Sequence, residues 1–474
     1  MKKRNHNSLF WLTIGLLFGP SSAHAKPNLI FIMADDLGYG DLGCYGQKLI
    51  KTPRLDQMAK GGMKFTRFYS GSTVCAPSRS VLMTGQHMGH THVRGNAGGD
   101  MTRQSLRAID ITVAEKMKEA GYATALIGKW GLGEVGQEGH PLKQGFDYFY
   151  GYLNQVHAHN FYPTFLWQNN QKHLLKNVVK PVSDKSRAGF IGGAATERHE
   201  YSHDLFTKES LEWIRKNQKN PFFLYLPLTI PHANNEGTRM FGDGAEVPDY
   251  SIYEKEAWPK QDKGQAAMIT RMDRDLGRIL DLLKELKIEE NTLVMFTSDN
   301  GPHNEAGHNP ELFNPSGPLR GMKRTLTEGG IRVPTIAWWP KTIKNGAVCD
   351  QPLYFGDLMS TACEMAQINP PKQIDSVSFL PTLQDRGKEQ ARHKFMYWEF
   401  YERTFRQAVV MENWKLIRSA MDNSTIELYD LSQDIHEDEN LASKQPAIAQ
   451  RLISYIEEAH HPHPSWQTPR SKKK

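Results

Sequence analysis

The sequence is poor in cysteine, with only Cys44, Cys75, Cys349 and Cys363 among its 474 residues. A secreted scaffold that depends on disulfides normally shows a denser, even set. The spacings contain no C-x-x-C pair, which excludes the common zinc-binding patterns. If Cys75 has another task, at most one disulfide can form among the other three.

After residue 25 the chain lacks an apolar run long enough to cross a membrane. The leader is different: a basic stretch at 2–4 precedes an apolar segment at 9–19, and residues 23–25 read Ala-His-Ala. This order is typical of a secretory signal peptide, and an uncleaved N-terminal anchor is the less favoured alternative. We therefore expect residues 1–25 to be removed, the mature chain to begin at Lys26, and the protein to be periplasmic or secreted.

The chain also lacks a strong net charge once its two ends are set aside. Its formal charge is +6, but the leader and the C-terminal tail at 470–474 are both basic. The body between them carries a charge of about −1, so we expect neither nucleic acid nor an anionic membrane as a partner. An anionic ligand must instead be held by a local cluster of basic residues.

Apolar runs alternate with helical patterns over most of the chain. Four apolar runs end in polar residues, at 28–33, 123–127, 222–230 and 292–297. Helical periodicity lies between them, at 113–120, 204–217 and 265–286. The alternation predicts an α/β fold with a large, mostly parallel sheet sandwiched by helices. Ligands bind beyond the carboxyl ends of such strands, so the polar strand ends point to one converging site.

The pattern changes near residue 385. From residue 395 onward, short strand-like pieces precede a last helical pattern at 447–459. We therefore expect a main domain over residues 26–385 and a small antiparallel C-terminal subdomain over residues 386–474.

The sharpest local pattern is Cys75-Ala-Pro-Ser-Arg79. Its proline favours the first turn of a helix, and Arg79, one turn after Cys75, can face the same side. Taken alone, the segment also fits a buried cysteine ahead of a helix. The motif resembles that of the type I sulfatases of the alkaline phosphatase superfamily, whose C-x-P-S-R segment is recognised by a maturation enzyme. The resemblance spans almost the whole mature chain, and it implies that Cys75 is oxidised to formylglycine and that Arg79 is a catalytic cation.

Two further motifs supply oxygen ligands after strand ends: Asp35 and Asp36 follow the first strand, and Asp299 and Asn300 follow a later one. Either pair alone is typical of an Asx turn or a helix cap. Carboxylates gathered at one edge repel each other unless a cation lies between them. An all-oxygen set suits Ca²⁺ first and Mg²⁺ second, so we expect one Ca²⁺ per chain. By resemblance, the modified Cys75, or the sulfate bound to it, completes the shell.

Basic residues that can hold a sulfate oxyanion also follow predicted strands or lie in glycine-rich segments. A lone basic residue is by default a solvated surface charge, and we assign Arg320 and Arg324 to that class. Glycine-rich surroundings and family positions favour a catalytic role for Lys129 and Lys323. By the same resemblance, His232, in a Pro-His-Ala segment after a strand, lies near the leaving oxygen.

One position departs from the family pattern. Many members read Gly-Lys-Trp-His-Leu-Gly, with a histidine that contacts the formylglycine or the sulfate, whereas this chain has Gly131 there. The candidates for its replacement are His157 and His159, in an insert after the Lys129 strand, and His303. An exposed histidine pair on a loop is the plain alternative for the first two. We expect these three histidines to contact the substrate.

The insert over residues 150–167 is rich in aromatic residues. Several of them offer flat apolar faces to the C–H surfaces of a sugar: Tyr150, Tyr152, Tyr162 and Trp167. Phe161 and Phe165 are more typical of the core of a loop. We predict that this insert selects a sulfated sugar, by loose family resemblance a galactose-type unit of a polysaccharide.

Taken together, the motifs predict a sulfuric ester hydrolase that acts on sulfate monoesters of a carbohydrate. A phosphodiesterase or phosphonate hydrolase of the same superfamily can share the metal and the nucleophile, although the sequence shows no obvious second metal cluster. An inactive protein that binds sulfated glycans is the other alternative, and Gly131 is its only support.

Overall fold

The computed structural model describes residues 26–96, 101–183, 191–402, 404–419, 421 and 423–468. The expected signal peptide at residues 1–25 and the basic tail lie outside these ranges. Within them, no helix is long and apolar enough to span a membrane. All four cysteines are free.

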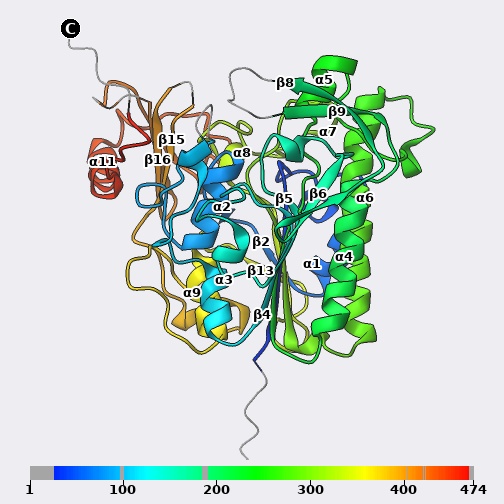
Figure 1. The fold of residues 1–474 in the computed structure, drawn as a ribbon. Helices are drawn as coiled ribbons and strands as arrows, with labels where there is room; N and C mark the ends of the chain where they lie inside the picture. The colour runs from blue at the N-terminus through cyan, green and yellow to red at the C-terminus, as the bar shows by residue number, and fades with distance from the viewer. Residues whose placement is uncertain are drawn as a thin grey trace, which may run out of the picture.

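A ten-stranded sheet forms the centre of the molecule (Figure 1). Its strands are β1 (Asn28–Ala34), β2 (Met63–Phe65), β4 (Ala123–Lys129), β5 (Tyr148–Tyr152), β6 (Phe165–Gln168), β7 (Gln171–Leu174), β10 (Phe222–Pro227), β11 (Thr292–Ser298), β12 (Thr335–Trp338) and β13 (Ala347–Cys349). The strand order is β13-β2-β12-β11-β1-β10-β4-β5-β6-β7. The five strands from β11 to β5 are parallel, whereas β12 on one side and β6 and β7 on the other are antiparallel to their neighbours.

The central strands are continuous apolar runs because both faces of the sheet are covered. All seven residues of β1 are buried. Alternate side chains point to opposite faces, so Phe31 and Met33 join one core cluster while Ile30 and Ile32 join the other. The expected mostly parallel sheet between helical layers is therefore confirmed.

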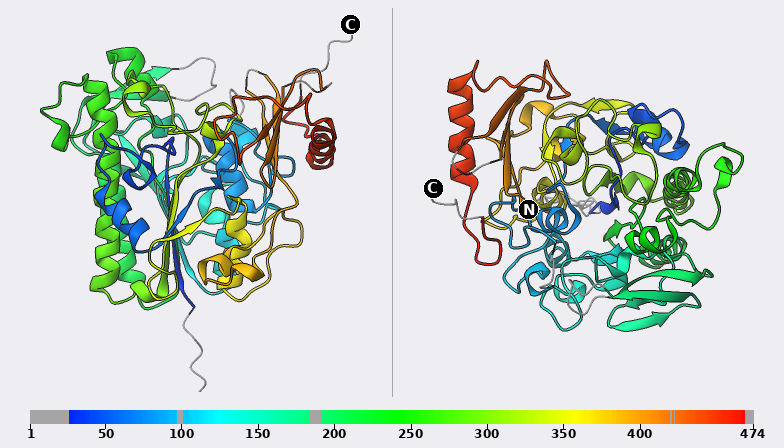
Figure 2. Two further views of the ribbon diagram at one scale, coloured as in Figure 1. Left: turned by 180° about the vertical axis from the view of Figure 1, so that it is seen from behind. Right: turned by 90° about the horizontal axis from the view of Figure 1, so that it is seen from above.

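Three of the larger helices cover each face of the sheet (Figures 1 and 2). One face carries α2 (Cys75–Thr84), α3 (Val113–Glu119) and α9 (Asp357–Met365). The other carries α1 (Pro53–Lys60), α4 (Ser202–Asn217) and α6 (Lys260–Glu285). Shorter elements connect these layers: β3 (Phe68–Tyr69), β8 (Val178–Ser183), β9 (Ile191–Glu197), β14 (Leu353–Tyr354), α5 (Asn235–Phe241), α7 (Pro310–Phe313), α8 (Glu328–Ile331) and α10 (Leu380–Leu383).

The C-terminal part forms a second, four-stranded antiparallel sheet, as expected. It consists of β15 (Met396–Phe400), β16 (Arg406–Met411), β17 (Trp414–Arg418) and β18 (Ile426–Asp430), with α11 (Pro446–Ala459) packed on its outer face. Trp398 of β15 is fully buried, and its indole N–H donates to the carbonyl oxygen of Ser70 at 2.8 Å. The second sheet thus packs directly against the core of the first part of the chain, and a boundary near residue 385 stays a prediction.

A buried ionic cluster joins the two sheets. The ammonium nitrogen of Lys415, in β17, lies 2.9 Å from a carboxylate oxygen of Glu328, in α8, and 2.9 Å from one of Glu437. The Tyr69 hydroxyl donates to Glu328 at 2.9 Å. The charged side chains are fully buried, so removal of the single lysine would leave two carboxylates without their shared cation.

We predict that Lys415→Met lowers the free energy of unfolding by about 3–5 kcal/mol, because it leaves buried charge uncompensated. The measurement is urea unfolding followed by fluorescence. Lys394→Met is the matched control: Lys394 pairs with Glu458 at 2.7 Å, but both side chains are more than half exposed. The control should cost no more than about 1 kcal/mol. Equal losses in the two variants would show that the cluster does not stabilise the contact between the sheets.

Candidate active site

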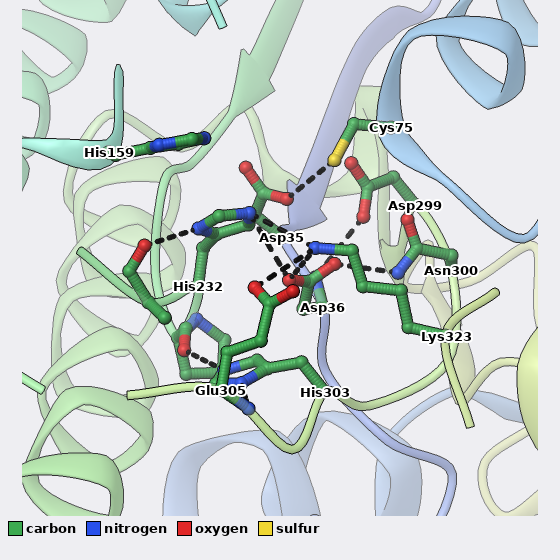
Figure 3. A network of polar contacts seen from close by, with 12 residues as sticks. Asp35, Asp36, Cys75, His159, His232, Asp299, Asn300, His303, Glu305 and Lys323 are labelled. Atoms are coloured by element: carbon green, nitrogen blue, oxygen red, sulfur yellow. Dashed lines mark hydrogen bonds and ion pairs between the residues drawn. The ribbon is translucent and has the colours of Figure 1, made fainter. Parts of the chain in front are cut away.

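Most of the residues singled out from the sequence meet at the carboxyl edge of the parallel strands, and Figure 3 shows Cys75, Asp35, Asp36, Asp299 and Asn300 close together there. Asp35 and Asp36 follow β1, and Asp299 and Asn300 follow β11, which pairs with β1 in register up to Ala34 and Ser298. Lys129 is the last residue of β4, and His232 follows β10. These strands are neighbours in the sheet, so motifs far apart in sequence lie side by side.

Cys75 is the first residue of α2, and its side chain is almost fully buried. Its Sγ lies 3.4 Å from Oδ1 of Asp35. Ligand atoms of Asp35, Asp36, Cys75 and His232 all lie within 4.8 Å of one another. Burial raises the pKa of the Cys75 thiol well above its ordinary value, and Asp35 adds to the rise. An unmodified thiol here stays protonated and is a poor nucleophile.

The Ser78 and Arg79 side chains explain why the motif at Cys75 needs these residue types. The Ser78 hydroxyl donates to the carbonyl oxygen of Asp299 at 2.6 Å. The guanidinium of Arg79, fully buried, donates to the carbonyl oxygen of Lys129 at 2.5 Å and to Oδ2 of Asp299 at 2.8 Å. These bonds fix the start of α2 against the ends of β4 and β11. Arg79 therefore links Asp299 of the carboxylate cluster to the end of β4.

The oxygen donors fit a hard cation. Asp35, Asp36, Asp299 and Asn300 are all fully buried. The Asn300 amide nitrogen donates to Oδ1 of Asp36 at 2.7 Å, whereas its Oδ1 has no hydrogen-bond partner within the described part of the chain. A buried acceptor without a partner is costly unless a ligand satisfies it. The site thus offers three carboxylates and an amide oxygen, the donor type that calcium prefers.

Lysine ammonium groups balance two of the three carboxylates. Lys129 Nζ lies 2.6 Å from Asp35, and Lys323 Nζ lies 2.7 Å from Asp36. Burial acts to raise the pKa values of Asp35 and Asp36, but these lysines outweigh it and hold both below the ordinary value. Burial and the charge of Asp35 raise the pKa of Asp299 to about 7. The Arg79 guanidinium, 2.8 Å from Asp299, is the third cation, and it offsets only part of this rise.

His232 is neutral in this environment. Its Nδ1 lies 2.7 Å from the carbonyl oxygen of Ala233, which requires the proton to sit on Nδ1. Nε2 then accepts from the ammonium of Lys323 at 3.1 Å. Burial, followed by the charge of Lys323, lowers the pKa of His232 well below its ordinary value.

His159 and His303 both flank His232, but in different ways. The His159 ring stacks on His232 with centroids 4.8 Å apart, and its Nδ1 lies 3.0 Å from a carboxylate oxygen of Glu236. His303 uses both ring nitrogens for backbone contacts, at 2.8 Å to the Pro231 carbonyl oxygen and at 3.0 Å from the Glu305 N–H. His159 thus lies against the His232 ring within the site. His303 instead bonds to the backbone of the loops that carry Pro231 and Glu305.

The structure places His157 differently. Its ring packs against Tyr152 and Phe165, with centroids 4.9 and 4.6 Å away. Burial lowers its pKa to about 4. The two histidines of the insert therefore point in different directions, and His157 joins an aromatic cluster instead of the carboxylates.

The expected sugar-facing role of the insert's tyrosines is wrong. Tyr150, Tyr152 and Tyr162 are each no more than 3% exposed and belong to the core beneath the sheet, together with Phe161. The reason is that the insert contains the end of β5 and most of β6, which lies between β5 and β7 in the sheet, so these side chains turn inward. Trp167 stays partly buried at the edge.

Two arginines assigned to the surface are in fact paired. Arg324 lies 2.6 Å from Glu305 and 3.4 Å from Glu402, and Arg320 lies 3.2 Å from Glu427. The expectation of solvated charges is wrong because acidic partners from distant segments fold against them. Nothing in the periodicity of the chain marks these partners.

A second group, His87, His90 and Asp375, could also hold a metal ion by distance alone. Its hydrogen bonds account for it without one. Asp375 accepts from the backbone N–H of His87 at 2.9 Å and lies 2.9 Å from Nδ1 of His90, while Nδ1 of His87 accepts from the Gly89 N–H at 3.1 Å. We therefore assign this group a structural role.

Comparisons with known proteins agree with the geometry. A sulfatase family model matches residues 27–368, and a model for the C-terminal part of N-sulphoglucosamine sulphohydrolase matches residues 322–461. The chain is 33% identical to the N-acetylgalactosamine-6-sulfatase of Canis lupus familiaris, over 77% of this chain and 67% of that protein. It is 29% identical to the N-acetylgalactosamine-6-O-sulfatase of Bacteroides thetaiotaomicron, over 91% and 93%. The solved structure of Ps i-CgsB in complex with k-i-k-neocarrahexaose matches with a TM-score of 0.75 and 25% identity, over 94% of each chain.

The family model alone covers most of the chain, and the catalytic motifs it implies converge at one strand edge. The chain therefore belongs to the sulfatase family and is a sulfuric ester hydrolase.

Proposed function

We propose that the protein removes sulfate from a galactose-type unit of a sulfated oligosaccharide or polysaccharide, with formylglycine at position 75 and one calcium ion. The observation that carries the proposal is the contact between Cys75 and Asp35, at 3.4 Å, beside buried lysines. The substrate class is supported by the two relatives named for N-acetylgalactosamine 6-sulfate and by the neocarrahexaose complex. Export to the periplasm or the cell exterior, and conversion of Cys75 by a maturation enzyme, belong to the same proposal.

The modification answers a chemical problem at position 75. A thiol held protonated by burial cannot attack sulfur efficiently, and a simple serine or cysteine would be left as a stable sulfate ester. A hydrated formylglycine supplies one hydroxyl as the nucleophile and a second whose deprotonation releases the sulfate.

The cations around position 75 bind the sulfate and disperse its charge. The Lys129 ammonium pairs with Asp35, the Lys323 ammonium pairs with Asp36, and Arg79 keeps Asp299 in place. Asp35, Asp36, Asp299 and Asn300 would hold calcium, which supplies electrostatic stabilisation of negative oxygen when it is bound. Fixed charges in a buried site act strongly because they need no reorganisation during the reaction.

The leaving oxygen must receive a proton. His232 is the closest candidate by its position at the strand edge, but its Nε2 carries no proton in the resting state. The Lys323 ammonium, 3.1 Å from Nε2, keeps its protons because the charge of Asp36 raises its pKa, so it is the protonated group beside His232 that can donate to the leaving oxygen. The His159 ring stacks on His232 and is oriented by its contact with Glu236, so it is placed to contact the sugar that carries the sulfate.

We predict that, in protein made with a competent maturation system, the tryptic peptide containing residue 75 is lighter than its cysteine form, as mass spectrometry will show. Cys75→Ala should lower kcat on sulfated N-acetylgalactosamine by at least ~1000-fold, because it removes the nucleophile. Cys363→Ala, at another buried free cysteine, is the control and should keep its activity. Full activity in a preparation that contains only unmodified Cys75 would contradict the mechanism.

We also predict that Asp299→Ala abolishes both bound calcium and turnover, because it removes one of three carboxylates from the cluster. Metal analysis after equilibration with calcium and gel filtration measures the first effect. Asp281→Ala, at an aspartate that is more than half exposed, should retain one calcium per chain and full activity. Calcium retained at full occupancy by Asp299→Ala would mean that the strand-end carboxylates do not form one metal site.

For His159, we predict a selective effect on the sugar. His159→Ala should lower kcat/KM on the sulfated sugar about 10-fold more than on a small aryl sulfate, because a hydrogen bond to a sugar hydroxyl is lost. Glu236→Gln should show the same selectivity in weaker form, and His199→Ala, at a half-exposed histidine, should show none. An equal loss on both substrates would assign His159 to the sulfate instead of the sugar.

A further inference from the structure

We propose that the side-chain amide of Gln155 is a further sulfate-binding group, which occupies the space that Gly131 leaves open. This inference rests on the proposed function, because it assigns a role at the same site. A Cβ built on Gly131 would lie 2.9 Å from Cδ of Gln155 and closer still to its Nε2. The amide of Gln155 thus fills the position where a side chain at residue 131 would begin. Gly131 has a φ of +80°, a conformation that favours glycine, so this arrangement suits the residue that the chain has.

The amide nitrogen of Gln155 has nothing to donate to. Nε2 is buried and has no hydrogen-bond partner among the residues that the structure describes. A primary amide carries two N–H donors, and native proteins rarely bury such a group without a partner. A ligand oxygen that arrives at this position would satisfy it.

The amide lies at the edge where the catalytic residues gather. Gly131 comes two residues after Lys129, whose ammonium lies 2.6 Å from Asp35. The Gly131 N–H donates to the carbonyl oxygen of Leu153 at 3.1 Å, so the segment after β5 runs beside the segment after β4. Gln155 therefore follows the next parallel strand along the same edge, β5, in the way that Gly131 follows β4.

The turn that carries Gln155 is held firmly. The Asn154 side chain accepts from the backbone N–H groups of Val156 and His157, at 2.8 and 3.1 Å, and donates to Glu134 at 2.8 Å. These bonds occupy both the oxygen and the nitrogen of the Asn154 amide, whereas the neighbouring Gln155 amide nitrogen has no hydrogen-bond partner among the described residues. A donor fixed before the ligand binds contributes more than one that must first be ordered.

The chemistry of an unused N–H pair selects an oxygen acceptor. In this site the incoming acceptor is the sulfuryl group, whose oxygens already meet the cations of Lys129 and Lys323. A neutral amide adds a hydrogen bond to the sulfuryl group without adding a further charge to a site where Lys129, Lys323 and Arg79 already pair with the three carboxylates. The expected partner of Nε2 is therefore a sulfuryl oxygen of the substrate.

The test is Gln155→Leu, which keeps the volume of the side chain and removes both donors. We expect kcat/KM to fall by about 10- to 100-fold, and by the same factor on a small aryl sulfate and on the sulfated sugar, because the lost bond goes to a charged acceptor. The inhibition constant of inorganic sulfate should rise in parallel. Formylglycine content and bound calcium, measured on each preparation, should match the wild type.

Gln144→Leu is the matched control. Gln144 is also buried, but its Nε2 donates to the backbone carbonyl oxygens of Arg107 and Glu138, at 3.4 and 3.0 Å. This variant should lose thermal stability and keep its inhibition constant for sulfate, whereas Gln155→Leu should keep its stability.

Unchanged kinetics and sulfate inhibition in Gln155→Leu would show that Gln155 only fills space, and the inference would be wrong. A loss confined to the sugar substrate would also overturn it, because the amide would then contact the sugar. If wild-type protein with verified formylglycine and calcium hydrolyses no sulfate ester, the proposed function fails instead, and the two failures are told apart by the wild-type assay.

Discussion

Charge compensation among buried groups is the constraint on which the site depends. Asp35, Asp36 and Asp299 are fully buried within one small region, where their mutual repulsion and loss of water both oppose ionisation. Lys129, Lys323 and Arg79 oppose this effect from three different segments of the chain. The residues that hold the carboxylates are thus also the residues that we propose to bind the sulfate, so under this proposal binding and stability depend on the same set of contacts.

The fold makes this concentration of charge possible. The loops that follow neighbouring parallel strands meet at the carboxyl edge of the sheet. The apolar strands beneath these loops are covered on both faces. Residue 75 is the first residue of helix α2, and Ser78 and Arg79 of the same motif bond that helix to the strand ends. The short motif that begins at Cys75, the proposed nucleophile, therefore also fixes α2 to the ends of the strands.

The sequence predicted the parts of this arrangement that repeat or that carry a recognised motif. The buried strands ending at Ala34, Lys129 and Ser298 could be anticipated because an apolar run followed by polar residues has a direct physical meaning. The direction of individual side chains in the insert could not be anticipated from the sequence, because Tyr152 turns inward only once β5 and β6 pair. The proposed role of Gln155 could not be predicted either, since it depends on the absence of a side chain at Gly131.

Arg324 connects the main part of the chain to the C-terminal part. It reaches Glu305 in the main part of the chain and Glu402 in the C-terminal part, and its neighbour in sequence is Lys323. The residue next to Lys323, whose ammonium lies 2.7 Å from Asp36, is therefore tied to both parts of the chain. An exchange of the C-terminal part between relatives would consequently change one of the two partners of Arg324 even if every residue around the carboxylates were kept.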